Sequence, residues 1–134
     1  MTYTIDKTLK ATPFDAAVEM TRSALGKHGF GVLTEIDVKA TMKKKLDADV
    51  GDYLILGACN PKMALEAMKI EPKVGAMLPC NVIVRDIGGG DVMVSAIDPV
   101  ASMQAIDNTT LTQVAGTVRG MLEAVIAELP SKQS

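Results

Sequence analysis

Apolar residues follow a period of two along several stretches of the chain, which is the pattern of β-strands with one buried face. Residues 1–10 alternate in this way, and only Lys7 interrupts the apolar set. Residues 53–59 carry apolar side chains at both parities, as expected for a central strand that is covered twice. The pattern predicts five strands: residues 1–10, 30–36, 53–59, 81–87 and 92–97, the last two joined as a hairpin through residues 88–91.

Between these strands the apolar period lengthens to that of a helix. Thr12, Pro13 and Asp15 predict a helix start with a hydroxyl cap, a proline in the first turn and an early carboxylate. Gly29 can adopt the left-handed conformation that ends such a helix. Further helices are predicted to start at Asp37, to run from Asn60-Pro61 to Glu71, and to extend from Leu111 to Pro130.

Each predicted helix has one apolar face that we expect to point inward. These inward residues are Phe14, Val18, Thr21 and Leu25 in the first helix; Val38, Met42 and Leu46 in the second; Ala64, Leu65 and Met68 in the third; and Leu111, Val114, Ala115, Val118, Leu122, Val125 and Leu129 in the last. A stripe of small residues, Gly116, Gly120, Ala124 and Ala127, runs beside the last of these faces. Either a second copy of the chain or another element of the same chain could approach closely there.

The order of elements predicts an α+β fold in one domain. We expect a curved, mainly antiparallel sheet of about five strands, with a long C-terminal helix and an N-terminal helix packed on it. A three-layer mixed sheet is the alternative. No repeat or low-complexity tract divides the chain, so residues 1–129 form the predicted domain and residues 130–134 a frayed tail.

Composition narrows the classes of function. The chain has 134 residues, 48% of them hydrophobic, and a formal net charge of −2, so it supports one core but no field that would concentrate a nucleic acid or a membrane surface. Aromatic residues make up only 3%, too few for base-stacking platforms. The N-terminus does not resemble a secretion signal, and no apolar run is long enough to span a bilayer. Two cysteines fit a reduced cytoplasm, where we expect this protein to reside.

Four landmarks occur in order along the chain: residues 29–37 (Gly-Phe-Gly-Val-Leu-Thr-Glu-Ile-Asp), 57–61 (Gly-Ala-Cys-Asn-Pro), 78–82 (Leu-Pro-Cys-Asn-Val) and 95–99 (Ser-Ala-Ile-Asp-Pro). Together they resemble the domain-of-unknown-function 302 family, over roughly residues 12–100. The resemblance implies a compact α+β domain, commonly bacterial or archaeal, that assembles as a homodimer. It implies no settled activity.

Two similar tripeptides, Cys59-Asn60-Pro61 and Pro79-Cys80-Asn81, form the candidate site. If their strands are antiparallel neighbours, the end of one lies beside the start of the other, and the two thiols approach each other. Cys59 and Cys80 are then candidate ligands for a soft metal such as Cu(I) or Zn(II), and Cys59, Asn60, Cys80 and Asn81 are candidates for binding a small ligand. The competing interpretation is that both cysteines simply pack in the core.

Three hypotheses follow from this site. The first, which we favour, is a homodimeric module that binds a small ligand or a soft metal. The sequence does not identify the cofactor. The second is a redox or transfer enzyme with a thiol nucleophile, which would need a positioned base or a tuned thiol pKa. The third is a structural or partner-binding protein.

Other motifs are better explained by structure than by chemistry. His28, the only histidine, ends the first helix and is expected to meet its negative terminus. The acidic residues 47–52 lack the glycine position and the closing glutamate of a calcium loop. Residues 88–90 are a glycine run without the Lys-Ser or Lys-Thr of a phosphate loop. The lysines of residues 39–45 are expected to form a solvated helix face.

Overall fold

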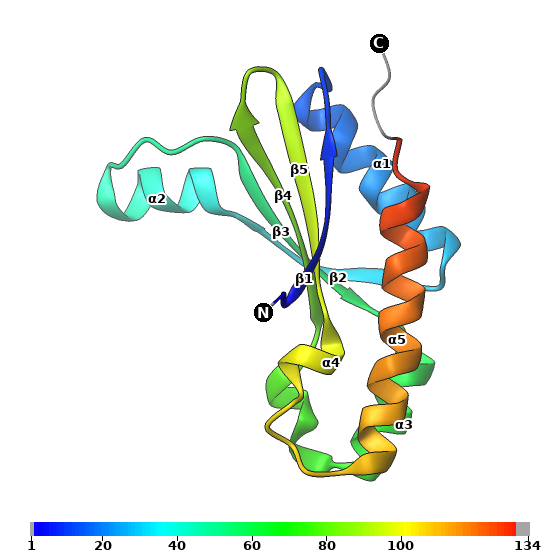
Figure 1. The fold of residues 1–134 in the computed structure, drawn as a ribbon. Helices are drawn as coiled ribbons and strands as arrows, with labels where there is room; N and C mark the ends of the chain where they lie inside the picture. Colours follow the sequence, from blue (N-terminus) through cyan, green and yellow to red (C-terminus); the bar gives the residue numbers. More distant parts are fainter. Residues whose placement is uncertain (1, 131–134) are drawn as a thin grey trace.

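The computed structural model describes residues 2–130 and contains an open, five-stranded antiparallel sheet (Figure 1). The strands are β1 (Thr4–Leu9), β2 (Gly31–Asp37), β3 (Tyr53–Cys59), β4 (Cys80–Gly88) and β5 (Asp91–Ile97), in the spatial order β1-β5-β4-β3-β2. All four neighbouring pairs are antiparallel, which confirms the predicted sheet and makes the mixed-sheet alternative wrong. The predicted frayed tail falls largely on residues 131–134, outside the described part of the chain.

The helices are α1 (Phe14–Lys27), α2 (Val38–Leu46), α3 (Pro61–Ile70), α4 (Pro99–Ser102) and α5 (Thr109–Glu128), with a 3₁₀-helix η1 (Pro72–Met77) between α3 and β4. The four longer helices were predicted, whereas η1 and α4 were not. Thr12 does not cap α1: the cap position is Pro13, without a side-chain hydrogen bond, and the Thr12 hydroxyl donates to the carbonyl of Lys10 at 2.9 Å instead. Gly29 has φ of +82° and ends α1 as expected.

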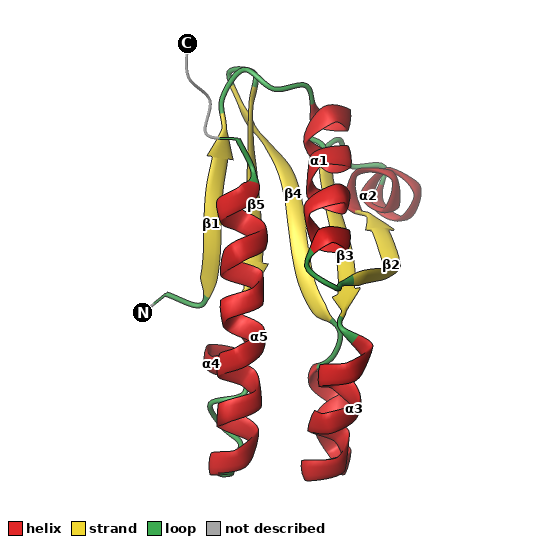
Figure 2. Cartoon of the chain, turned by 90° about the vertical axis from the view of Figure 1, so that its right-hand side faces the viewer, coloured by secondary structure: helices red, strands yellow, loops and turns green. Residues whose placement is uncertain are grey.

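Helices α1 and α5 lie side by side on one face of the sheet (Figure 2), as predicted. Leu56, Val82 and Ala96 are neighbours across β3, β4 and β5 and are fully buried beneath them. All seven residues predicted to point inward from the last helix are buried. Burying these side chains removes apolar surface from water, which stabilises the fold by about 25 cal/mol per Å². This burial is the main force that holds the helices on the sheet.

A second, smaller cluster extends the molecule beyond one end of the sheet, where α3, α4 and the first half of α5 meet (Figure 1). Its buried members are Ala67, Val74, Met103, Leu111, Val114 and Ala115. Met63 packs against both this cluster and the main core. Helix α5 therefore spans two packing centres, and the boundary between them lies at the ends of β3 and β4.

The Lys7 side chain, which interrupts the apolar pattern of β1, binds the C-terminal end of helix α5. Its ammonium group donates to the carbonyl of Ala127 at 3.1 Å and to that of Leu129 at 2.6 Å. The carbonyls at the end of a helix have no partner within it and carry the negative end of the helix dipole. The ammonium group of Lys7 donates hydrogen bonds to these carbonyls and places a positive charge beside the negative end of the dipole.

Two of the predicted helix faces are wrong. In α3 the buried residue is Ala67, while Leu65 and Met68 are 52% and 41% exposed, because α3 approaches α5 through small alanines rather than through its large side chains. In α2 no residue is buried, and Leu46 is 70% exposed. Helix α2 projects from the β2–β3 edge, away from α1 and α5 (Figure 1), so Val38 and Met42 are only half-buried and Leu46 is exposed.

Candidate functional site

A small cavity lies at the boundary between the two packing clusters, and we call it the thiol pocket. Its volume is about 30 Å³. It is lined by Phe30, Ala58, Cys59, Asn60, Met63, Ala64, Ala67, Leu78, Pro79, Cys80, Pro99, Met103, Leu111, Val114, Ala115 and Val118. The wall is almost entirely apolar, and the sulfur atoms and the Asn60 amide are its principal polarizable or polar groups. Three of the four predicted ligand-binding residues thus line one cavity.

Cys59 and Asn60 reach the pocket from the end of β3. Cys59 is partly exposed, and Asn60 caps α3 by accepting a hydrogen bond from the Met63 backbone N–H at 3.1 Å. A Cβ atom at Gly29 would lie 3.0 Å from Nδ2 of Asn60, so glycine at the end of α1 leaves room for this amide. Because its oxygen accepts the cap hydrogen bond, Asn60 orients the start of α3, and its NH₂ group remains available as a donor.

Cys80 enters from the start of β4, opposite Ala58 of β3. The premise of the predicted site, that these two strands are antiparallel neighbours, is therefore confirmed. The Cys80 side chain lies on the helix-covered face and is 8% exposed. Burial and, to a smaller extent, charge repulsion from Cys59 together raise the pKa of the Cys80 thiol from 9.0 to about 11. Both cysteines are free thiols.

Asn81 does not reach the thiol pocket. Successive side chains of a strand point to opposite faces, so the residue after buried Cys80 faces away from the helices. Asn81 is exposed there and pairs with Gly57 of β3. The structure brings Cys59, Asn60 and Cys80 together and leaves Asn81 outside.

Two methionines in the wall were not predicted as site residues. Met63 lies in the first turn of α3, and Met103 ends α4. In the sequence, methionines at helical spacing look like core residues, and Met103 follows a short helix that was not predicted. Within residues 2–130, no group of three or more His, Cys, Asp and Glu side chains is placed to hold a metal ion. Methionine is not one of these four residue types, although its thioether sulfur is a ligand for soft metals.

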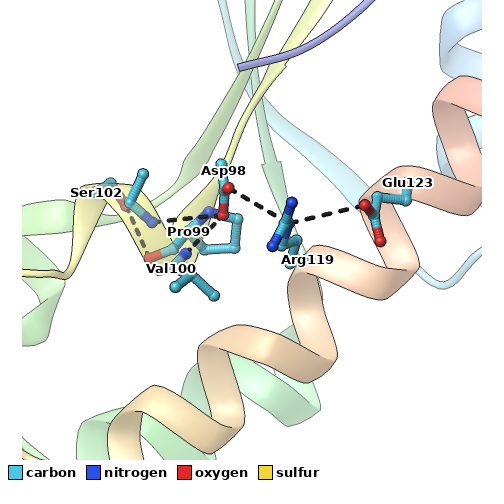
Figure 3. A network of polar contacts seen from close by, with 7 residues as sticks. Asp98, Pro99, Val100, Ser102, Arg119 and Glu123 are labelled. Carbon is cyan, nitrogen blue, oxygen red and sulfur yellow. Dashed lines mark hydrogen bonds and ion pairs between the residues drawn. The ribbon is translucent and has the colours of Figure 1, made fainter. Parts of the chain in front are cut away.

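Helix α4 is held in place by a buried carboxylate (Figure 3). Asp98 is 8% exposed and accepts from the backbone N–H of Val100 at 2.9 Å and, more weakly, from that of Ala101 at 3.4 Å. Its other oxygen lies 3.3 Å from Nε of Arg119 on α5. The sequence signal for this role was the pair Asp98-Pro99, a helix start of the same kind as Asn60-Pro61. Asp98 thereby fixes the wall that ends in Met103.

His28 does not line the pocket and has a structural role. Its Nε2 is 2.9 Å from Oε1 of Glu128, and Lys27 lies 3.2 Å from the other oxygen of the same carboxylate. These contacts join the ends of α1 and α5. The hydrogen bond with His28, followed by that with Lys27, lowers the pKa of Glu128.

The acidic loop and the glycine run also have structural explanations. Lys43 pairs with Asp47 at 2.9 Å and with Asp49 at 3.3 Å, so these carboxylates already have a cation beside them. Residues 88–90 all have positive φ and form the turn between β4 and β5. Among residues 2–130, none of the helices is both long and apolar enough to pass through a bilayer.

Comparisons with known proteins agree on one family. The family profile described as "Domain of unknown function DUF302" matches residues 5–129. The structure is similar to the crystal structure of an uncharacterized conserved DUF302 protein from Bacillus stearothermophilus, with a TM-score of 0.87 and 22% sequence identity, over 95% of this chain and 98% of that one. At this identity the likeness establishes the fold alone. A search of curated proteins finds no match.

Proposed function

This chain belongs to the DUF302 family, a domain of unknown function, and from the geometry of its thiol pocket we propose that it is a soft-metal-binding module. The observation that carries the proposal is the meeting of Cys59 and Cys80 at one small, apolar cavity. Thiolate is the protein ligand that soft metals prefer. The cytoplasm, which keeps such thiols reduced, is the compartment in which this function would operate.

The size of the cavity favours an ion over an organic ligand. Sites for small organic molecules commonly enclose about 300–1,000 Å³, and a benzene-sized cavity is about 150 Å³. The thiol pocket has about 30 Å³, room for an ion or for one or two waters. An organic ligand would have to open the packing between α3 and α5, whereas a metal ion would not.

The lining also disfavours a thiol enzyme. A nucleophilic cysteine is activated by an adjacent base or cation. The residues that line the pocket include no His, Asp, Glu, Lys or Arg. Nothing around the cavity takes the proton in a transfer reaction, so binding explains the site better than catalysis.

Substituting either cysteine tests the proposal. Under anaerobic, reducing conditions, the purified chain is titrated with Cu(I) against a chromophoric Cu(I) chelator. We expect one Cu(I) per chain, and we expect Cys80→Ser or Cys59→Ser to weaken its binding by about a thousandfold, since each removes one of two thiolates (~4 kcal/mol). Circular dichroism checks that both variants remain folded.

Two results would contradict the metal proposal. One is wild-type protein that fails to compete with the chelator for Cu(I). The other is a Cys80→Ser variant that stays folded and binds Cu(I) as tightly as the wild type. Zn(II) titrated in parallel distinguishes a general thiol site from one that prefers Cu(I).

We also propose that the chain forms a homodimer through residues 33–50, which we call the arm. The arm comprises the second part of β2, helix α2 and the first residues of the loop that leads to β3. The arm exposes four large apolar side chains, Leu33, Ile36, Leu46 and Val50. A nine-residue helix with no buried residue, such as α2, has little stability of its own in water. Residues 37–52 carry both signs of charge equally, on Lys39, Lys43, Lys44 and Lys45 and on Asp37, Asp47, Asp49 and Asp52, so two copies can meet without net repulsion.

Light scattering at low micromolar concentration tests the arm. We expect a dimer for the wild type and a monomer for Leu46→Glu, because a buried, unpaired carboxylate is costly at an interface. Leu65→Glu on exposed α3 is the matched control and should leave the dimer intact.

The small-residue stripe of α5 is the competing surface, since Gly116 and Gly120 face open space. A dimer that survives Leu46→Glu but dissociates with Gly120→Leu would move the interface to α5.

A further inference from the structure

The thiol pocket holds more soft sulfur than its two cysteines provide. Four residues with sulfur in their side chains line the same cavity: Cys59, Met63, Cys80 and Met103. They come from four separate places in the fold, the end of β3, the first turn of α3, the start of β4 and the end of α4. The remaining lining is hydrocarbon apart from the Asn60 amide. Thiolate and thioether are the donors that select Cu(I), and the lining of this small apolar cavity contains both cysteine and methionine.

Met63 is the best placed of the two methionines. It lies four residues after Cys59, and its backbone N–H is held by the Asn60 side chain at 3.1 Å, so the first turn of α3 is fixed beside the cysteine. Its side chain is partly buried and packs against both clusters, which places it across their boundary. Methionine has three rotatable bonds and adapts its sulfur position readily.

Met103 lines the pocket from the end of α4. It is 7% exposed and belongs to the smaller cluster. Asp98 and Arg119 fix the α4 turn that ends in Met103 (Figure 3). Helix α4 holds this residue in packed surroundings, so its sulfur has less freedom to move toward the cysteines than that of Met63.

Resting on the proposed function, we propose that the thiol pocket is selective for Cu(I) over Zn(II), with Cys59 and Cys80 as thiolate ligands and Met63 as a thioether third ligand. Binding converts two thiols into two thiolates: Cu⁺ and two R–SH give Cu(SR)₂⁻ and two protons. No electron is transferred, and the thioether adds without losing a proton. Zn(II) requires four ligands in its structural sites, with N, O or thiolate donors, and the pocket supplies only two of these besides methionine.

The start of α3 supports the charge balance of this site. The bis-thiolate complex carries one net negative charge in apolar surroundings, where an uncompensated charge is costly. Cys59 immediately precedes the Asn60 cap of the ten-residue helix α3, so the positive end of that helix dipole lies beside the thiolate. A neutral thioether completes the coordination without adding further charge.

Leucine substitutions separate ligation from packing. Leucine matches methionine in volume and apolar character, so Met63→Leu should fold normally. We expect it to weaken Cu(I) binding at least tenfold in the chelator competition and to leave Zn(II) binding unchanged. Met121→Leu is the matched control, because Met121 packs against the main core and does not line the pocket. Copper X-ray absorption should show three sulfur neighbours in the wild type and two in Met63→Leu.

The outcomes distinguish this inference from the proposed function. Equal Cu(I) affinity for Met63→Leu and Met121→Leu, with two sulfur neighbours in the wild type, overturns the thioether assignment and leaves the thiolate site standing. A loss of affinity in Met103→Leu but not in Met63→Leu overturns the choice of Met63. Cu(I) binding that survives Cys80→Ser overturns the proposed function itself.

Discussion

Replacing Gly57 with alanine is expected to destabilise the fold by about 3 kcal/mol, as overpacking of a close contact does. Gly57 is buried in β3, where Thr34 of β2 and Pro79 approach its backbone from neighbouring segments. A Cβ atom there would collide with the hydroxyl of Thr34 and would lie 2.8 Å from Cγ of Pro79. The added methyl group requires the Thr34 side chain and the Pro79 ring to move away from Gly57. Chemical denaturation followed by circular dichroism measures the loss.

A second glycine provides the matched control. Gly120→Ala places the same methyl group in open space on helix α5, where alanine should stabilise the chain by up to about 1 kcal/mol. The double variant Gly57→Ala/Thr34→Ala removes the colliding hydroxyl and should recover part of the loss, because the two sites are in contact. If Gly57→Ala unfolds at the same denaturant concentration as the wild type, the close packing of β2 on β3 at this point is wrong.

The metal-free protein is expected to lose about 2–3 kcal/mol of stability through Cys80 as the pH rises from 9 to 11. The pKa of this thiol is raised from 9.0 in the unfolded chain to about 11 in the folded one, first by burial and then by Cys59. The folded state therefore holds the proton more tightly than the unfolded state. Its contribution is complete below pH 9 and disappears as the pH passes 11, and each pKa unit corresponds to about 1.4 kcal/mol.

The effect is measured as a difference between two proteins. Urea unfolding of the wild type and of Cys80→Ala is compared from pH 7 to pH 11, with reductant and chelator present, so that the titration of tyrosines and lysines common to both cancels. The stability advantage of the wild type should shrink by about 2–3 kcal/mol over this range. Cys59→Ser should keep most of the dependence, because burial is the larger cause. A difference that is constant with pH would show that Cys80 is accessible to water.

The two cysteines show which part of the candidate site could be predicted from the sequence. Their prediction as one site rested on a topological assumption, that β3 and β4 are antiparallel neighbours. The register confirms this pairing and sets Ala58, the residue before Cys59, opposite Cys80. Asn81 is exposed and does not line the pocket. The resemblance between the two Cys-Asn pairs hid this difference, since Asn60 follows the end of one strand and Asn81 lies inside another.

The roles of three residues could be recognised only from the tertiary structure: Met63, Met103 and Asp98. Each belongs to a short element whose packing partner is distant in sequence, so no local pattern distinguishes a pocket methionine from a core methionine. The misassigned face of α3 has the same origin. Periodicity favoured burial of Leu65 and Met68, but α3 meets α5 through Ala67, because a small residue permits a closer approach of the two helix backbones. Similarly, the apolar side of α2 is covered only in part, with Val38 and Met42 half-buried and Leu46 exposed.

By itself the sequence determined the five strands, the four longer helices and their α+β arrangement, because backbone periodicity and capping residues such as Asp37 and Asn60 act over a few residues. Only the tertiary structure decided which faces are covered, how Lys7 ends α5, and that four sulfur-bearing residues surround one cavity. These features depend on contacts between segments that lie far apart in the chain. Their geometry is set by packing of the whole domain, which no local pattern encodes.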